Sequence, residues 1–242
     1  MQLRIGTSGW HYKHWRGSFY DERCPASGML ASYVQQFDAV EINNTFYRLP
    51  KAETLRVWRD CTPPGFCFAL KASRFITHNK KLKDPQNALD RFLPPVVEGL
   101  GKKLGPILFQ LPPAWAVNAE RLEQFLAALP KRLRYAFEFR HPSWHVPPVC
   151  EVLRVYNAAF CIFELAGLHS PLEITADFAY VRLHGPGGKY QGSYSDQAIA
   201  EWAARIRSWR GLREVHVYFD NDQAGYAAEN ALRLKQQLLS AR

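Results

Sequence analysis

The sequence predicts an α/β fold: a single-domain TIM, or (β/α)8, barrel with an irregular connection between strands six and seven. Eight apolar segments with strong β character alternate with segments of helical periodicity along the chain. The 242 residues are a common length for one such barrel, and no composition break or low-complexity linker divides them. We therefore treat residues 1–242 as one domain, with an open, doubly wound sheet as the alternative architecture.

The expected strands are runs rich in Val, Ile, Phe and Tyr, and helical patterns lie between them. The strands cover residues 3–9, 39–46, 66–73, 105–112, 135–140, 158–164, 178–185 and 214–221. The helices cover residues 29–37, 52–60, 85–93, 118–129, 147–156, 196–209 and 224–239. Asn118 and Ser195 are the expected N-caps of two helices. Residues 165–177, "LAGLHSPLEITAD", are too short and broken for a full helix.

Composition limits the classes of function. The chain carries 31 Lys and Arg against 22 Asp and Glu, a formal net charge of +9, and most of the excess lies in residues 1–121. A basic balance favours anionic partners such as phosphates, nucleic acid or a membrane surface, although many basic proteins bind none of these. The five scattered cysteines form no CxxC pair, which argues against a disulfide framework or a zinc site. Without a long apolar run or a signal-peptide pattern, we expect a cytoplasmic protein with no membrane partner.

Charged side chains occupy alternate positions in several expected strands. In "YAFEFRHPSW" (135–144), Glu138 and Arg140 stand between aromatic residues. A half-exposed antiparallel strand would explain this pattern, and so would a barrel strand whose inward face is polar. The same parity recurs near the carboxyl ends of other strands, where barrel enzymes carry their active sites. The expected inward set is Glu41, Asn43, Lys71, Gln110, Glu138, Arg140, Glu164, Arg182, His184 and Asp220.

Longer motifs run through the chain: "GTSGW", "VEINNTFYRLP", "ALKASRFITHNKKL", "GPILFQLPP", "YAFEFRHPSW", "YVRLHGPGGKY" followed by "GSY", and "VYFDNDQAGYAAENA". Together they resemble the DUF72 (YecE-like) family of TIM-barrel proteins from end to end. The resemblance implies the barrel and a shared polar mouth, whereas the family as a whole has no settled activity. The segment "FELAGLHSP", which contains Glu164, departs most from the family pattern.

The inward carboxylates and cations suit an acid/base and anion-binding set. Crowded carboxylates raise one another's pKa while nearby cations keep others ionised, which separates acid from base roles. The catalytic candidates are Glu41, Glu138, His184 and Asp220. Among them, Glu138 or Glu41 is the expected base and His184 the proton donor, while Lys71, Arg140 and Arg182 would clamp an anion. The alternative is a fully paired ion network that serves only as structure.

The loops after the strands supply further binding candidates. Residues 71–83, "KASRFITHNKKLK", carry five Lys or Arg and one His without an acid, which suits either phosphate contacts or a solvated charge run. The glycine-containing loops 184–190 and 221–225 lie where barrels commonly bind phosphate, although Asp222 would compete as a helix cap. Rim aromatics, including Tyr12, Trp15 and Trp144, would stack a ligand or anchor loops. The binding candidates are Trp10, Asn43, Tyr47, Lys71, His78, Gln110, Arg140, Arg182, Tyr190 and Tyr194.

These patterns predict an acid/base enzyme, with hydrolysis as the candidate reaction, that acts on a phosphate-bearing substrate such as a nucleotide or nucleic acid. No metal or other cofactor is expected, because His78, His141 and His184 come from separate elements and no HxH or HExxH spacing concentrates ligands. Two alternatives remain. One is glycoside hydrolysis, which needs two carboxylates, and the other is a non-catalytic nucleic-acid-binding protein. The partner is therefore an anionic small molecule or a nucleic acid.

Overall fold

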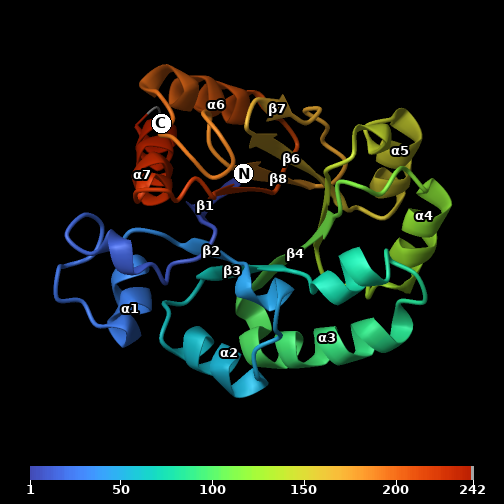
Figure 1. Cartoon of the computed structure of the whole chain (residues 1–242), viewed down its shortest axis with the longest axis horizontal. Coiled ribbons are helices and arrows are strands. Elements are labelled where there is room, and N and C mark those ends of the chain that lie inside the picture. Colours follow the sequence, from blue (N-terminus) through green and yellow to red (C-terminus); the bar gives the residue numbers. More distant parts are fainter. Residues whose placement is uncertain (241–242) are drawn as a thin grey trace.

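The computed structural model describes residues 1–240 and shows a barrel of parallel strands surrounded by helices (Figure 1). Its strands are β1 (Gln2–Thr7), β2 (Ala39–Ile42), β3 (Cys67–Lys71), β4 (Leu104–Leu111), β5 (Tyr135–Phe139), β6 (Ala159–Leu165), β8 (Phe178–Leu183) and β9 (Glu214–Phe219). Neighbouring strands follow the order β1–β9–β8–β6–β5–β4–β3–β2. All eight expected strands are present, so the predicted barrel is confirmed.

The barrel closes between β1 and β2, where an isolated backbone bridge replaces a continuous ladder. The Tyr33 hydroxyl, at the end of α1 (Met29–Tyr33), spans this gap. It accepts a hydrogen bond from the Thr7 N–H and donates one to the Ala39 carbonyl, both at 3.0 Å. A Cβ at Gly6 would lie 2.1 Å from the Ala39 carbonyl oxygen, so the close approach of the two strands requires glycine here.

The remaining helices also lie outside the strands (Figure 1). They are α2 (Ala52–Asp60), α3 (Gln86–Leu100), α4 (Ala119–Ala128), α5 (Pro147–Val155), α6 (Asp196–Ser208) and α7 (Tyr226–Leu239). Asn118 Oδ1 accepts a hydrogen bond from the Arg121 N–H at 2.8 Å, and Ser195 Oγ accepts one from the Ala198 N–H at 3.2 Å. Both predicted N-caps are therefore confirmed.

Two helices differ from the prediction by four residues or more at their carboxyl ends. Helix α1 ends at Tyr33 rather than at residue 37. Helix α3 continues to Leu100 instead of ending at residue 93, because Pro94 and Pro95 stand inside it without breaking it. Val96 and Leu100 are buried beyond the two prolines, and this packing offsets the local cost of a proline in a helix.

The connection between β6 and β8 is irregular, as predicted. It contains only a two-residue strand, β7 (Leu168–His169), which pairs antiparallel with β6. Two hydroxyl groups of this segment hold it against β6. Ser170 Oγ accepts a hydrogen bond from the Phe163 N–H at 2.9 Å, and Thr175 Oγ1 accepts one from the Phe160 N–H at 2.8 Å. This connection is therefore held to the barrel by side-chain hydrogen bonds, whereas the other connections contain a helix that packs on the strands.

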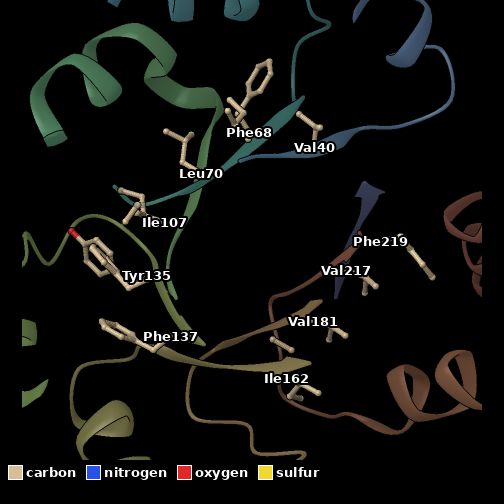
Figure 2. Close-up of a cluster of buried hydrophobic side chains, with 14 of the residues drawn as sticks. Val40, Phe68, Leu70, Ile107, Tyr135, Phe137, Ile162, Val181, Val217 and Phe219 are labelled. Atoms are coloured by element: carbon tan, nitrogen blue, oxygen red, sulfur yellow. The ribbon is translucent and has the colours of Figure 1, made fainter. Parts of the chain in front are cut away.

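The strands separate two apolar layers. Figure 2 shows the outer one, in which side chains such as Val40, Val181 and Val217 project from the strands away from the barrel axis. The inner layer is smaller and comprises Ala39, Cys67, Ala69, Leu108, Ala136, Ala159, Cys161, Phe178, Tyr180 and Tyr218. Because strand side chains alternate, the inward positions that follow these residues toward the carboxyl ends form the mouth.

Within residues 1–240, every helix is too short or too polar to cross a membrane.

Candidate active site at the carboxyl end of the barrel

Arg182, from β8, is the centre of a buried charged network. Its guanidinium donates hydrogen bonds to Glu41 Oε1 at 2.7 and 3.1 Å, to Glu138 Oε2 at 2.7 Å and to Asp220 Oδ2 at 3.2 Å. The side chains of Glu41 and Glu138 are fully buried and that of Arg182 is 1% exposed, whereas 14% of Asp220 is exposed. One cation therefore joins the ends of four strands, in agreement with the predicted parity.

The two deeply buried carboxylates have further hydrogen-bond donors around them. Glu41 accepts hydrogen bonds from Ser8 Oγ at 2.7 Å and from the Tyr180 hydroxyl at 2.6 Å. Glu138 also accepts a hydrogen bond from Arg140. Burial opposes ionisation of Glu138, but the two neighbouring guanidinium groups hold its pKa well below the usual range. These two carboxylates are paired and enclosed, and no face of either is open to a substrate.

His184 is a neutral member of this network. Its Nε2 lies 3.2 Å from Arg140 Nη2 and 3.3 Å from Arg182 Nη1, and its Nδ1 lies 3.0 Å from Asp220 Oδ2. Because guanidinium groups only donate, Nε2 accepts and Nδ1 carries the proton that is donated to the carboxylate. Burial and the Arg182 charge lower the pKa of His184. His184 was expected to be a proton donor, but in this arrangement Nε2 has no proton and the proton on Nδ1 is donated to Asp220.

The opposite side of the mouth holds polar groups without partners. Within residues 1–240 the Lys71 ammonium makes no hydrogen bond or ion pair, and its Nζ lies 4.5 Å from the centroid of the Phe46 ring. Burial and the Arg182 charge lower the pKa of Lys71 to about 8. Asn43 Oδ1 and Gln110 Oε1, on the strands beside β3, are buried and likewise lack a hydrogen-bond partner. We call Lys71, Asn43 and Gln110 the unpaired side of the mouth.

An open cavity of about 440 Å³ lies beside Asp220. Asp222 lines the same cavity and accepts a hydrogen bond from Trp15 Nε1 at 2.6 Å, while His14 Nε2 lies 3.0 Å from its other oxygen. Burial raises the pKa of Asp222 to about 6, and the charge of Asp220 contributes. In contrast, the hydrogen bond from His184 and the charge of Arg182 lower the pKa of Asp220 despite its burial. The cavity is lined by Tyr12, His14, Lys189, Tyr190, Gln191, Asp220, Asp222 and Gln223.

Three predicted binding residues lie around this mouth. Tyr190 lines the cavity, and its ring packs edge-on against His184 with centroids 5.4 Å apart. His78 lies in η4 (Phe75–Asn79), a single turn of π-helix, and its ring packs edge-on against Phe46. The Lys71 ammonium lies over the face of the same Phe46 ring. Tyr47 packs edge-on against Phe46 as well and is 76% exposed at the rim.

Two other predicted binding residues are loop anchors. Trp10 is 7% exposed and packs between Trp58 of α2 and Phe68, in the outer apolar layer. Tyr194 is 1% exposed, and its hydroxyl accepts a hydrogen bond from the Gly185 N–H at 3.1 Å. Both rings are buried, so neither has a free face for a ligand. They hold the loops against the outer layer of the barrel. Trp15 and Trp144 are fully buried in the same way.

Glu164 was expected among the inward residues, and that expectation is wrong. In β6 the inward positions are Cys161 and Phe163, and the ring of Phe163 lies 5.2 Å from the Arg140 guanidinium. Glu164 points the other way and accepts a hydrogen bond from Trp202 of α6 at 3.4 Å. The chosen register was one residue off in this strand, which reverses the faces.

The two glycine-containing loops serve their own packing. Gly185 has φ +109°, and a Cβ on it would lie 2.2 Å from the Gln191 carbonyl oxygen. Asn221 links the two loops, since its Nδ2 donates to the Gly192 carbonyl at 2.8 Å. The expected cap of the last helix is also wrong, because Gly225 is the N-cap of α7 and Asp222 bonds to Trp15 and His14 instead.

The sequence reasoning overlooked Ser8, Tyr180 and the pairing of Asp222 with His14. Ser8 and Tyr180 obey the inward parity of β1 and β8, so the alternation would have found both. The pairing of Asp222 with His14 joins residues more than 200 positions apart and left no sequence signal. Among the residues described, no cluster of three or more His, Cys, Asp and Glu side chains is arranged to hold a metal ion.

Solved structures resemble this barrel closely. A DUF72 family protein from Thermotoga maritima superposes with a TM-score of 0.87 over 99% of this chain and 100% of its own, at 29% identity. A DUF72 family protein from Enterococcus faecalis superposes with a TM-score of 0.82 over 98% of this chain and 96% of its own, at 21% identity, and supports the fold alone.

Sequence comparison leads to the same group. UPF0759 protein YunF of Bacillus subtilis is 26% identical over 98% of this chain and 94% of its own length. UPF0759 protein YecE of Escherichia coli is 33% identical over 48% of this chain and 42% of its own length. The family described as "Protein of unknown function DUF72" matches residues 4–242. The chain therefore belongs to the DUF72 family, as the motifs predicted.

Proposed function

We propose that this protein is an acid/base enzyme that acts on a phosphate-bearing substrate at the mouth of the barrel. One observation carries the proposal: Asp220 and Asp222 line the same open cavity, and their surroundings shift their pKa values in opposite directions. Two carboxyl groups that are driven apart in this way can divide the roles of base and acid. Asp220, which stays ionised, is the base, and Asp222 is the acid.

This assignment changes the roles expected from the sequence. Glu41 and Glu138 hold the network in place, because their side chains are buried and their oxygens are paired. His184 positions Asp220 through its Nδ1–H. Asp220 is the network carboxylate that reaches the cavity, so a substrate proton has access to it.

The phosphate part of the proposal rests on the distribution of positive charge. Arg182 and Arg140 are occupied by carboxylates, whereas the ammonium of Lys71 has no partner within residues 1–240. A half-buried cation without a counter-ion has lost part of its hydration, and an anionic substrate would neutralise it. Lys189, on the cavity wall, is a second cation within the same mouth. A phosphate group is the substrate anion that this charge favours.

Glycoside hydrolysis is the second candidate. It is favoured by the rings of Tyr12 and Tyr190 on the walls of a cavity that holds two carboxyl groups. The two candidates differ in their need for an anion. A sugar substrate would bind without Lys71, whereas a phosphate-bearing substrate would lose affinity in a Lys71→Met variant.

The test combines binding with hydrolysis. Calorimetric titration with inorganic phosphate should show binding that the Lys71→Met variant loses at least about ten-fold. Hydrolysis of p-nitrophenyl phosphate should fall as the pH rises through about 6, where Asp222 loses its proton. Asp220→Asn should reduce the rate about a hundred-fold or more, and Asp222→Asn should remove the limb near pH 6.

A matched control is Asp90→Asn, an exposed carboxyl group on α3 that should leave the rate unchanged. Binding of phosphate that is equally strong in wild type and Lys71→Met would contradict the phosphate assignment. Equal pH profiles for wild type and Asp222→Asn would contradict the acid role of Asp222.

A further inference from the structure

Unlike Arg140 and Arg182, the half-buried Lys71 has no hydrogen-bond acceptor within residues 1–240. Arg140 and Arg182 each donate to a carboxylate. The face of the Phe46 ring attracts the Lys71 ammonium but offers it no lone pair in a hydrogen-bonding direction. The nitrogen of Lys71 lies at the carboxyl end of β3, at the level of the mouth where a substrate would arrive.

Lys103 provides an internal comparison, because it is also a partly buried lysine. Its ammonium donates to the carbonyl oxygens of Arg59 and Thr62, the latter at 2.6 Å, and to Thr62 Oγ1 at 3.0 Å. Three acceptors match the three protons of that ammonium, although burial also lowers the pKa of Lys103. Lys71 has no such acceptors within residues 1–240.

The charges that face Lys71 come from several elements. Arg182 on β8 opposes protonation, and Glu41, Glu138 and Asp220 favour it, but burial is the largest effect. The result is a pKa of about 8. At pH 8 about half of the Lys71 side chains therefore carry a free lone pair, against well under one in a hundred for an ordinary lysine with a pKa near 10.4. His78 packs on the same Phe46 ring, and burial together with the Lys71 charge lowers its pKa, so His78 is neutral at this pH.

We propose that Lys71 is a nucleophile that forms an imine with the carbonyl group of a hydroxylated aldehyde or ketone. The inference goes beyond the proposed acid/base function, because it adds covalent chemistry on Lys71, which the acid/base proposal uses only as a cation. A lysine amine that is desolvated and beside other cations is the usual form of such a nucleophile.

The step is a condensation. The Lys71 lone pair forms a bond to the carbonyl carbon, the C=O π pair moves to oxygen, and a proton from nitrogen reaches that oxygen to give a carbinolamine. The hydroxyl group then leaves with a second proton as water, and the nitrogen lone pair forms the C=N bond. One water is released for each imine, and no electron leaves or enters the pair of reactants. In the trapping experiment, cyanoborohydride then delivers a hydride to the imine carbon, and a proton from water completes a stable secondary amine.

Two amide oxygens, one on each side of β3, can accept hydrogen bonds from the hydroxyl groups of the substrate. Asn43 Oδ1 lies at the end of β2 and Gln110 Oε1 at the end of β4, and both are buried without a hydrogen-bond partner. An unsatisfied buried acceptor is costly, so a ligand O–H that supplies the missing donor is favoured. These two oxygens are the reason to expect a hydroxylated carbonyl compound rather than a simple aldehyde.

The test is imine trapping with glyceraldehyde and cyanoborohydride at pH 8, followed by peptide mapping by mass spectrometry. Lys71 should be labelled at least about ten-fold faster than Lys103 or Lys81, and faster with glyceraldehyde than with propionaldehyde. Lys81→Arg should leave the labelling of Lys71 unchanged, and Gln110→Met should reduce the preference for glyceraldehyde. The wild-type map is the primary result, so the proposal remains testable even where a variant fails to fold.

Labelling of Lys71 at the rate of exposed lysines would overturn the proposal, as would labelling that is equal for the two aldehydes. The outcome is independent of phosphate binding. Phosphate that binds without any trapped imine at Lys71 would leave the acid/base proposal intact and reject the nucleophile. A trapped imine without phosphate binding would support the nucleophile and reject the assignment of a phosphate-bearing substrate.

Discussion

The two sides of the barrel mouth treat buried charge in opposite ways. On one side, Arg182 gathers three carboxylates and every buried charged group has a partner. On the unpaired side, the ammonium of Lys71 and two amide oxygens have no partner among the residues that the structure describes. A paired buried network adds little net stability but is costly to break, whereas an unpaired polar group is costly as it stands. The paired side is therefore scaffold, and the unpaired side is where a ligand has something to contribute.

The largest effect should come from breaking the paired side. Arg182→Met leaves Glu41 and Glu138 buried without their shared cation, so it should lower the free energy of unfolding by about 3–5 kcal/mol. Urea denaturation of wild type and variant measures the loss. Arg154→Met is the matched control, because Arg154 pairs with two acids on the surface and should cost under about 1 kcal/mol.

A loss as small as that of the surface control would break the comparison. It would mean that the carboxylates take up protons or water when Arg182 is gone, and that both sides of the mouth are equally open to ligands.

Removing the unpaired charge of Lys71 should raise the free energy of unfolding, whereas removing Arg182 should lower it. Lys71→Met replaces a half-buried ammonium that has no counter-ion within residues 1–240 by an apolar group, so it should raise the free energy of unfolding at pH 7 by about 1–2 kcal/mol. The pKa of Lys71 is depressed to about 8 in the folded protein, so between pH 8 and about 10.4 the unfolded chain binds the extra proton. The stability advantage of the variant over wild type should therefore shrink through this window, a difference in which the buried Cys and Tyr groups common to both proteins cancel.

Urea midpoints measured across that pH range provide the test, with Lys102→Met, an exposed lysine, as the control. A variant less stable than wild type would show that Lys71 has a partner in solution, and the distinction between the two sides would then fail.

The sequence could predict the paired side better than the rest, for a physical reason. Alternation along a strand fixes which side chains face inward, and that rule placed Glu41, Glu138, Arg182 and Asp220 together. The rule failed at Glu164, because the irregular connection after β6 offers no helical pattern from which to check the register. Within strands, then, periodicity carries the information.

Loops follow no such rule. Trp10 and Tyr194 were expected at the mouth because they follow strands, but both rings are buried as loop anchors. The contact of Asp222 with His14 depends on how the first and last βα loops meet, which no local pattern encodes. The sequence also gave no sign of which cations are paired. It placed Lys71 and Arg182 in one anion clamp, whereas Arg182 is paired with carboxylates and Lys71 has no partner within residues 1–240.

The smallest effect concerns the basic loop next to the unpaired side. Lys80 and Lys81 lie after β3 and pair with no acid within residues 1–240, so Lys80→Gln with Lys81→Gln should change stability by less than about 0.5 kcal/mol. If the ligand is a small phosphate compound held at Lys71, phosphate affinity should stay within about two-fold of wild type, because these ammonium groups stand in solvent.

A nucleic-acid partner would instead reach the loop. In that case the slope of log affinity against log salt for a single-stranded oligonucleotide should fall by about 0.7 for each lost contact. Titrations of phosphate and of the oligonucleotide at several salt concentrations, on wild type and the double variant, separate the two classes. An unchanged slope would show that the ligand binds within the mouth alone. A reduced slope would show that the binding surface extends from the unpaired side to Lys80 and Lys81 on the rim.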